Sequence, residues 1–188
     1  AKCPFCRTPV PTSDEEYKVR LQKRAELGDA EAIFKLGWNY REGLYGFPQD
    51  YDKALELYHR AAELENAEAY CNVGYAYNYG EGVEVDEKKA THYYELAAMG
   101  GEANARYNLG NNEKNEGNID RAIKHFMIAI RGGHSDSLDY IKELYTKGSA
   151  TKEDYTKALE LYQAYLGEIK SSQRDKAAAH DNEEYRYF

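Results

Sequence analysis

The stretch ENAEAYCNVGYAYNYGEGVEVDEKKATHYYELAAM, residues 65–99, decides the fold because its pattern recurs through the chain. It is preceded by GDAEAIFKLGWNYREGLYGFPQDYDKALELYHRAAEL, from Gly28, and followed by GGEANARYNLGNNEKNEGNIDRAIKHFMIAIRG, from Gly100. The last and most diverged copy, from Gly133, is GHSDSLDYIKELYTKGSATKEDYTKALELYQAYLG. A repeated unit of roughly 20–50 residues indicates a solenoid, since one unit alone cannot bury its apolar face.

Each unit is predicted to form two helices joined by a turn. Apolar and small residues recur in each half at spacings of three and four, which places them on one helix face. The first half carries a small residue that lets another helix approach closely: Gly37, Gly74 and Gly110, replaced by Lys142 in the fourth unit. The second half carries an aromatic residue: Tyr58, Tyr94, Phe126 and Tyr162.

Polar residues mark where the helices begin. Asp50, Asp86 and Asp120 stand near the start of the second helices, where a carboxylate can cap free amides and oppose the helix dipole. In the fourth unit, Thr151 and Asp154 occupy that stretch. Ser13 and Glu16 form a capping-box pattern ahead of one more helix, which we interpret as an N-terminal cap.

The pattern A-x-A-x-x-x-L-G-x-x-Y-x-x-G-x-G-V-x-x-D-x-x-K-A-x-x-Y-Y-x-x-A-A resembles the Sel-one-like repeat, a relative of the tetratricopeptide repeat. Residues 67–98 match it nearly throughout, and the similarity covers residues 28–167. The resemblance implies an all-α, right-handed α/α solenoid. The expected parts are a stub or linker at 1–12, a cap helix at 13–27, repeats at 28–64, 65–99, 100–132 and 133–167, and a cap helix with a tail at 168–188.

The composition excludes several functions. The chain of 188 residues has a formal net charge of −8, which disfavours binding to nucleic acid or to an anionic membrane surface. Apolar runs are too short to cross a bilayer, so direct membrane insertion is not expected. Three cysteines leave one unpaired, which favours a reducing, intracellular compartment, and we expect the cytoplasm. The chain starts at Ala1, so we interpret it as a fragment whose targeting signal, if it has one, is missing.

Cys3 and Cys6, in the stretch CPFCRTPVP, resemble the last ligand pair of a RING-type zinc finger. Tetrahedral zinc needs four ligands, so these two can hold the metal only if ligands further upstream complete the site. A flexible cysteine pair without metal is the alternative. A redox dithiol is disfavoured because that motif opens a helix within a βαβ unit. We therefore expect no cofactor here, with zinc reserved for a longer chain.

The resemblance also implies a binding groove, since in the tetratricopeptide fold the first helices line the concave surface. By register, the groove residues are Glu31, Phe34, Trp38, Arg41, Glu68, Tyr75, Asn78, Asn104, Tyr107, Asn111, Lys114, Asp136, Asp139 and Glu143. Aromatic residues give contact area, and asparagines can form hydrogen bonds with a peptide backbone. The acidic end of the groove, in the fourth unit, favours a ligand with Lys or Arg. The alternative is that the aromatic members belong to the core.

The sequence therefore predicts a non-catalytic scaffold or adaptor that binds a protein or peptide in its groove. A second hypothesis is the substrate-recruiting region of a RING-type ubiquitin ligase, whose zinc finger would lie mostly upstream. A third, a hydrolase built on clustered carboxylates, would need a deep polar pocket that two-layer helical stacks rarely supply. Nothing in the residues predicts the oligomeric state.

Overall fold

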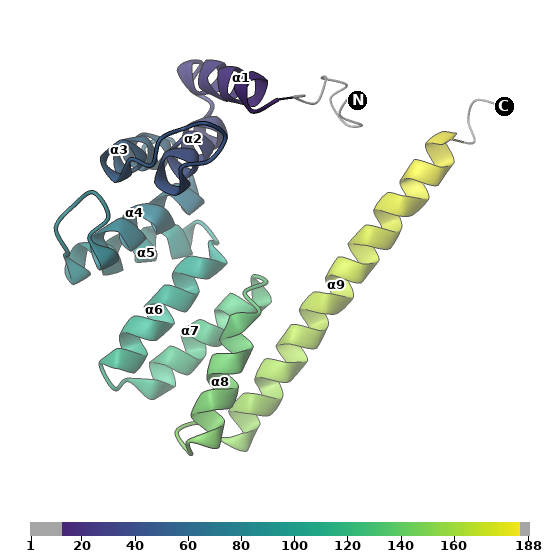
Figure 1. Ribbon diagram of the computed structural model, residues 1–188. Helices are drawn as coiled ribbons and strands as arrows, with labels where there is room; N and C mark the ends of the chain where they lie inside the picture. The colour runs from purple at the N-terminus through teal and green to yellow at the C-terminus, as the bar shows by residue number, and fades with distance from the viewer. Residues whose placement is uncertain (1–12, 185–188) are drawn as a thin grey trace. The chain divides into compact units, whose positions relative to one another are not determined.

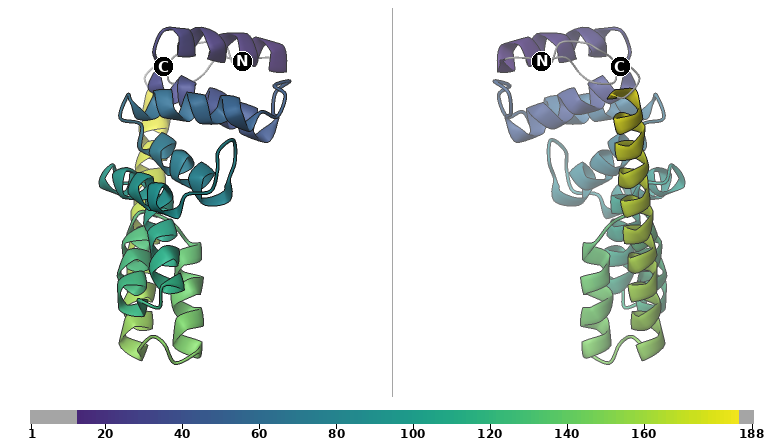
Figure 2. Two further views of the ribbon diagram at one scale, coloured as in Figure 1. Left: turned by 90° about the vertical axis from the view of Figure 1, so that its left-hand side faces the viewer. Right: turned by 90° about the vertical axis from the view of Figure 1, so that its right-hand side faces the viewer.

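The computed structural model describes residues 13–184, with side chains up to residue 172. All regular secondary structure in these residues is α-helical, as the repeats predict (Figures 1 and 2). The helices are α1 (Asp14–Glu26), α2 (Ala30–Glu42), α3 (Tyr51–Ala62), α4 (Ala67–Tyr79), α5 (Glu87–Met99), α6 (Ala103–Asn115), α7 (Ile119–Arg131), α8 (Asp136–Thr146) and α9 (Lys152–Glu184).

The chain forms two compact units, which we call the N-terminal unit, up to Glu102, and the C-terminal unit, from Ala103. In the N-terminal unit α1 packs on α2, α2 pairs with α3, α3 packs on α4, and α4 pairs with α5. In the C-terminal unit α6 pairs with α7, and α7, α8 and α9 pack against one another. These helix pairs are the two-helix units of a helical-repeat solenoid.

The predicted capping residues form hydrogen bonds with backbone amides at the starts of four helices. Ser13 accepts a hydrogen bond from the Glu16 amide at 3.2 Å, and Asp50 and Asp86 accept from amides three residues on, at 2.9 and 3.0 Å. Before α9, the Thr151 hydroxyl accepts from the Asp154 amide at 3.1 Å, while the Asp154 carboxylate accepts from the Thr151 amide at 2.9 Å.

The start of α7 differs from the other second helices. Asp120 lies within the first turn of α7 and Asn118 holds the N-cap position, without a side-chain cap bond. The shorter turn of this repeat moves the aspartate into the helix, where it opposes the dipole and does not cap.

The repeated glycines and aromatic residues meet inside each helix pair. A Cβ on Gly74 would stand 2.7 Å from the Tyr94 ring, and one on Gly110 would stand 2.7 Å from the Phe126 ring. Tyr94 and Phe126 are fully buried at these contacts. The glycine therefore sets the distance between the two helices of a repeat, as the sequence predicts.

Glu65, between α3 and α4, has a φ of +60°, whereas its counterparts Gly28 and Gly101 are glycines at +79° and +88°. A residue with a Cβ costs about 1–2 kcal/mol in this left-handed region. Glycine avoids this cost, but it gives the unfolded chain more conformational entropy, which offsets part of the gain in stability. Glu65→Gly is therefore expected to raise the free energy of unfolding by about 0.5–1 kcal/mol, measured by urea denaturation.

The matched control for that substitution is Glu63→Gly. Glu63 has a φ of −60° at the end of α3, where glycine brings no relief of strain. This variant is expected to lose about 0.5–1 kcal/mol. Equal destabilisation by both variants would contradict the account of Glu65.

The C-terminal helix differs from its prediction. A separate cap helix was expected after Gly167, but α9 continues through this residue to Glu184 and extends past the end of α8 (Figures 1 and 2). A glycine inside a helix costs about 1 kcal/mol, which does not break the helix where no proline follows. The predicted segment is thus part of the second helix of the fourth repeat. The Tyr185–Phe188 tail lies outside the described residues.

Among residues 13–184, every helix is either too short or too polar to cross a lipid bilayer.

Candidate functional site

The residues predicted to line a groove fall into two groups, because α2 and α4 belong to the N-terminal unit and α6 and α8 to the C-terminal unit. All but one of these side chains are at least partly exposed. The exception, Phe34, is 8% exposed and packs on Tyr58 with ring centroids 5.8 Å apart. Phe34 therefore belongs to the core of its unit.

Helices α2 and α4 carry matched strips of side chains, spaced by four, three and four residues so that each strip stays on one helix face. The strip on α2 consists of Glu31, Lys35, Trp38 and Glu42. The strip on α4 consists of Glu68, Asn72, Tyr75 and Tyr79. The repeat therefore places Trp38 and Tyr75 at equivalent positions of two successive first helices.

Arg41 connects the end of α2 to the neighbouring repeat. Its Nε donates to Glu81 Oε2 at 2.6 Å and its Nη2 to Glu81 Oε1 at 3.0 Å, a bidentate ion pair. Its Nη1 donates to Glu42 Oε1 at 2.6 Å. The same guanidinium lies 5.5 Å from the ring centroid of Trp38 and 4.6 Å from that of Tyr75, within range of cation–π attraction.

The guanidinium of Arg41 is a fixed cation. The hydrogen bonds to Glu81 raise the pKa of Arg41 further above its ordinary value, and burial opposes this effect. The side chain is only 16% exposed, with carboxylates bound to its N–H groups and the rings of Trp38 and Tyr75 nearby. Arg41 thereby holds Trp38 and Tyr75 in a defined arrangement.

Glu81, in the Gly80-Glu81-Gly82 turn between α4 and α5, was not predicted from the repeat register. The turn approaches the start of α3 so closely that a Cβ on Gly82 would stand 2.7 Å from the Tyr51 carbonyl oxygen. Gly82 also has a φ of +70°, which favours glycine. An acidic residue between two glycines of a packed turn is the signal that marks Glu81, although its partner is 40 residues away.

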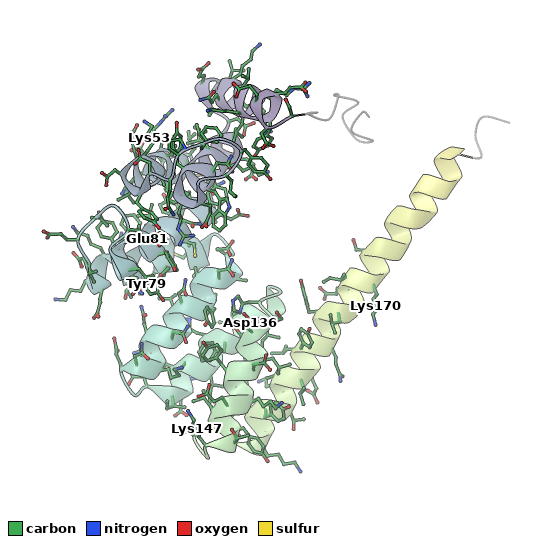
Figure 3. The ribbon with its side chains drawn as sticks, viewed as in Figure 1. Lys53, Tyr79, Glu81, Asp136, Lys147 and Lys170 are labelled. Carbon is green, nitrogen blue, oxygen red and sulfur yellow. The ribbon has the colours of Figure 1, made fainter. Side chains whose placement is uncertain are left out.

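Two aromatic side chains remain accessible around Arg41. Trp38 is 40% exposed, and Tyr79, whose ring centroid lies 4.3 Å from that of Tyr75, is 61% exposed. Figure 3 labels Tyr79 and Glu81 at the end of α4 and in the turn that follows. We call Trp38, Arg41, Tyr75, Tyr79 and Glu81 the Trp38 surface.

Carboxylates continue the strips away from the Trp38 surface. Burial, followed by the negative charges of Glu31 and Glu102, raises the pKa of Glu68, while Lys35 lowers it. Lys35 also pairs with Glu31 at 2.8 Å. The N-terminal ends of α2 and α4 thus hold more negative than positive charge.

The groove residues of the C-terminal unit are more involved in packing. Tyr107 stacks on His134 with ring centroids 4.3 Å apart, and His134 Nδ1 lies 2.9 Å from the hydroxyl of the buried Ser137. A hydrogen bond with Tyr107 raises the pKa of Tyr140 to about 12. Lys114 Nζ lies 4.6 Å from the Tyr140 ring centroid. Tyr140 and His134 were not predicted, because neither matches the groove register.

The remaining predicted residues of this unit, apart from Asn111, are exposed. Asp136 and Asp139 lie in the first turn of α8, where they oppose its dipole, and Glu143 pairs with Lys147. The hydrogen bond from Lys147 lowers the pKa of Glu143. Asn111 and Asn104 lie on α6, with Asn111 half-buried and Asn104 exposed.

His59 on α3 packs edge-on against aromatic rings, with centroids 6.5 Å from Tyr77 and 5.7 Å from Tyr93. Burial lowers the pKa of His59 below its ordinary value of 6.5, opposed by Glu63. The unfolded chain therefore binds a proton at His59 more readily than the folded chain does. The folded state keeps its full stability above pH 6.5, where His59 is neutral in both states, and loses stability as the pH falls through the folded pKa.

We therefore expect the free energy of unfolding to fall as the pH drops below 6.5 and His59→Gln to flatten this slope. Urea denaturation over a pH series measures the slope. His92→Gln, at an exposed position of α5, controls for the loss of an imidazole. An unchanged slope in His59→Gln would show that other groups govern it.

The cysteines predicted as metal ligands, Cys3 and Cys6, lie outside the described residues. Cys71 is buried in α4. In the part of the chain that the structure describes, no group of three or more His, Cys, Asp or Glu side chains is placed to hold a metal ion.

The Sel1 repeat model matches residues 30–66, 67–102, 103–134 and 143–164, which together make up more than half of the chain. Each match overlaps one of the four repeats expected from the sequence, and the fourth match starts at residue 143, after the predicted start at residue 133. They begin at residue 30, so they give no support to a zinc-finger stub at residues 1–12.

Known proteins are similar to this chain over half of its length or more. Chitin synthase regulatory factor 4 of Schizosaccharomyces pombe is 32% identical over 69% of this chain and 21% of its own length. The ERAD-associated E3 ubiquitin-protein ligase component HRD3B of Arabidopsis thaliana is 35% identical over 52% of this chain and 15% of its own length. The chain thus spans about a fifth or less of these curated relatives.

A Sel1 repeat protein from Oxalobacter formigenes has a similar solved structure, with a TM-score of 0.67 and 28% identity over 80% of this chain and 64% of that one. The repeat matches, the helix pairs and this structural likeness agree. The chain belongs to the Sel1 repeat family.

Proposed function

We propose that the chain is a non-catalytic protein-interaction scaffold and that its Trp38 surface binds an extended segment of a partner protein. The observation that carries the proposal is an exposed tryptophan beside the Arg41 guanidinium, which a bidentate ion pair with Glu81 fixes in place. Trp, Tyr and Arg are the residues that most often dominate protein interfaces. The Trp38 surface contains all three types.

The arrangement of Arg41 favours binding because it is complete before a partner arrives. Ordering a flexible side chain at an interface costs about 0.5–1.5 kcal/mol. Because Arg41 contacts Trp38, Tyr75 and Glu81 in the folded chain, the cost of ordering its side chain is met during folding and not during binding. A partner that covers Trp38 therefore meets a surface of fixed shape.

Asn78 on α4, in the same unit as the Trp38 surface, carries an amide group that can bond a peptide backbone. The predicted groove residues of the C-terminal unit stay a separate prediction. The relatives agree with an interaction role, since one is named a regulatory factor and another a component of a ligase. The partner of this chain is to be identified by experiment.

Affinity purification followed by mass spectrometry tests the proposal. The wild-type chain is compared with Trp38→Ala/Tyr75→Ala and with Tyr145→Ala, which removes an aromatic ring of similar exposure from α8. We expect the double variant to lose partners that the wild type and the control both retain. Identical partner sets for all three proteins would exclude the Trp38 surface.

A further inference from the structure

We propose that the segment bound by the Trp38 surface is basic, with a lysine or arginine side chain against Trp38 and Tyr79. This inference rests on the proposed function and specifies its ligand. It is carried by two features of α2 and α4: accessible aromatic rings and an excess of carboxylates along the two strips that carry these rings.

The charge balance along the two strips is negative. The carboxylates on α2, α4 and the turn after α4 are Glu31, Glu42, Glu68 and Glu81. The cations on the same elements that face them are Lys35 and Arg41. Lys35 pairs with Glu31, and Arg41 pairs with both Glu42 and Glu81. The carboxylates therefore outnumber the cations, and the remaining negative charge can attract a positive partner.

Glu68 marks where the negative charge is least compensated. Burial raises the pKa of Glu68, and the negative charges of Glu31 and Glu102 raise it further. Lys35 acts in the opposite direction but already pairs with Glu31. A positive side chain from a partner would relieve this repulsion, so binding and the local charge would reinforce each other.

The aromatic rings suit the same ligand. Aromatic faces attract cations that lie within about 6 Å of the ring centroid. The Arg41 guanidinium already lies within this distance of both Trp38 and Tyr75. The exposed area of Trp38 and Tyr79 is open to a second cation from outside. An acidic segment would find no free positive edge, because the hydrogen-bonding groups of Arg41 already bind two carboxylates.

Selection from a phage-displayed library of random dodecapeptides on the immobilised full chain tests the inference. The selected peptides are then synthesised and titrated while the fluorescence of Trp38, the single tryptophan of the sequence, is recorded. We expect the selected peptides to be enriched in lysine or arginine and to change the Trp38 emission. Raising the salt concentration is expected to weaken them.

Neutral isosteres isolate the charge. Glu42→Gln/Glu68→Gln is expected to weaken a selected basic peptide by about three- to tenfold. The control, Glu56→Gln/Glu95→Gln, removes the same charge from exposed positions of α3 and α5 and is expected to leave the affinity within about twofold.

The outcomes separate this inference from the proposed function. The basic ligand would be overturned by peptides that need Trp38 but carry no excess of basic residues. It would also be overturned if the Glu42→Gln/Glu68→Gln variant bound the peptides as well as the wild type does. Either result would leave the binding surface in place. Peptides that bind Trp38→Ala unchanged, or a selection that enriches none, would overturn both.

Discussion

Replacing Phe126 by alanine is expected to lower the free energy of unfolding of the C-terminal unit by about 3–5 kcal/mol. The ring is fully buried and fills the space that a Cβ on Gly110 would enter, 2.7 Å from its nearest atom. It also contacts Tyr107 and Tyr140, with centroids 6.0 and 5.6 Å away. Loss of the ring therefore leaves a cavity between α6, α7 and α8. Urea denaturation and amide hydrogen exchange measure the effect.

Tyr162→Ala is the matched control in the same unit. Tyr162 occupies the equivalent position of the fourth repeat, but it is half-buried and Lys142 replaces the glycine that would face it. A partly buried side chain contributes less, so we expect a loss of about 1–2 kcal/mol. A larger effect for Tyr162 than for Phe126 would contradict the glycine–aromatic contact as the centre of the repeat.

Trp38→Ala is expected to weaken a bound partner segment by about 30-fold or more, the loss typical of an interface residue worth at least about 2 kcal/mol. Trp38 has the largest accessible ring of the Trp38 surface, and its ring centroid lies 5.5 Å from the Arg41 guanidinium. Fluorescence anisotropy of a labelled segment measures the dissociation constant, and circular dichroism checks that the variant folds.

Tyr145→Ala controls for the removal of an exposed aromatic ring. Tyr145 is 37% exposed, close to the 40% of Trp38, and lies on α8 where it stacks on Tyr155. We expect this variant to bind within about twofold of the wild type, because exposed residues outside a binding surface contribute little to affinity. Equal weakening by both substitutions would indicate a general effect on the fold.

Much of the fold follows from local patterns in the sequence. The spacing of Gly74 and Tyr94 predicts which helices pair, because only a glycine permits the contact observed. Asp50 and Asp86 predict where second helices begin, since capping involves residues three positions apart. Both signals repeat, so each unit supports the assignment of the next.

The candidate site is less predictable because its main contacts join distant residues. Trp38, Arg41 and Tyr75 were predicted from the repeat register, but their connection through Glu81 depends on how the turn after α4 packs on α3. Tyr107 was predicted by the same register, yet its stacking on His134 follows from the packing of the next helix. Register gives the position of a residue and packing decides whether it remains accessible.

The most direct measurement of the central claim is the fluorescence of Trp38 in the wild-type chain during titration with a partner segment. Since the sequence contains one tryptophan, emission excited selectively at tryptophan comes from this residue when the partner segment carries no tryptophan. We expect the emission to change and to saturate at the same concentration as binding measured by anisotropy of the labelled segment. Saturable binding with unchanged Trp38 emission, and with unchanged affinity for Trp38→Ala, would contradict it.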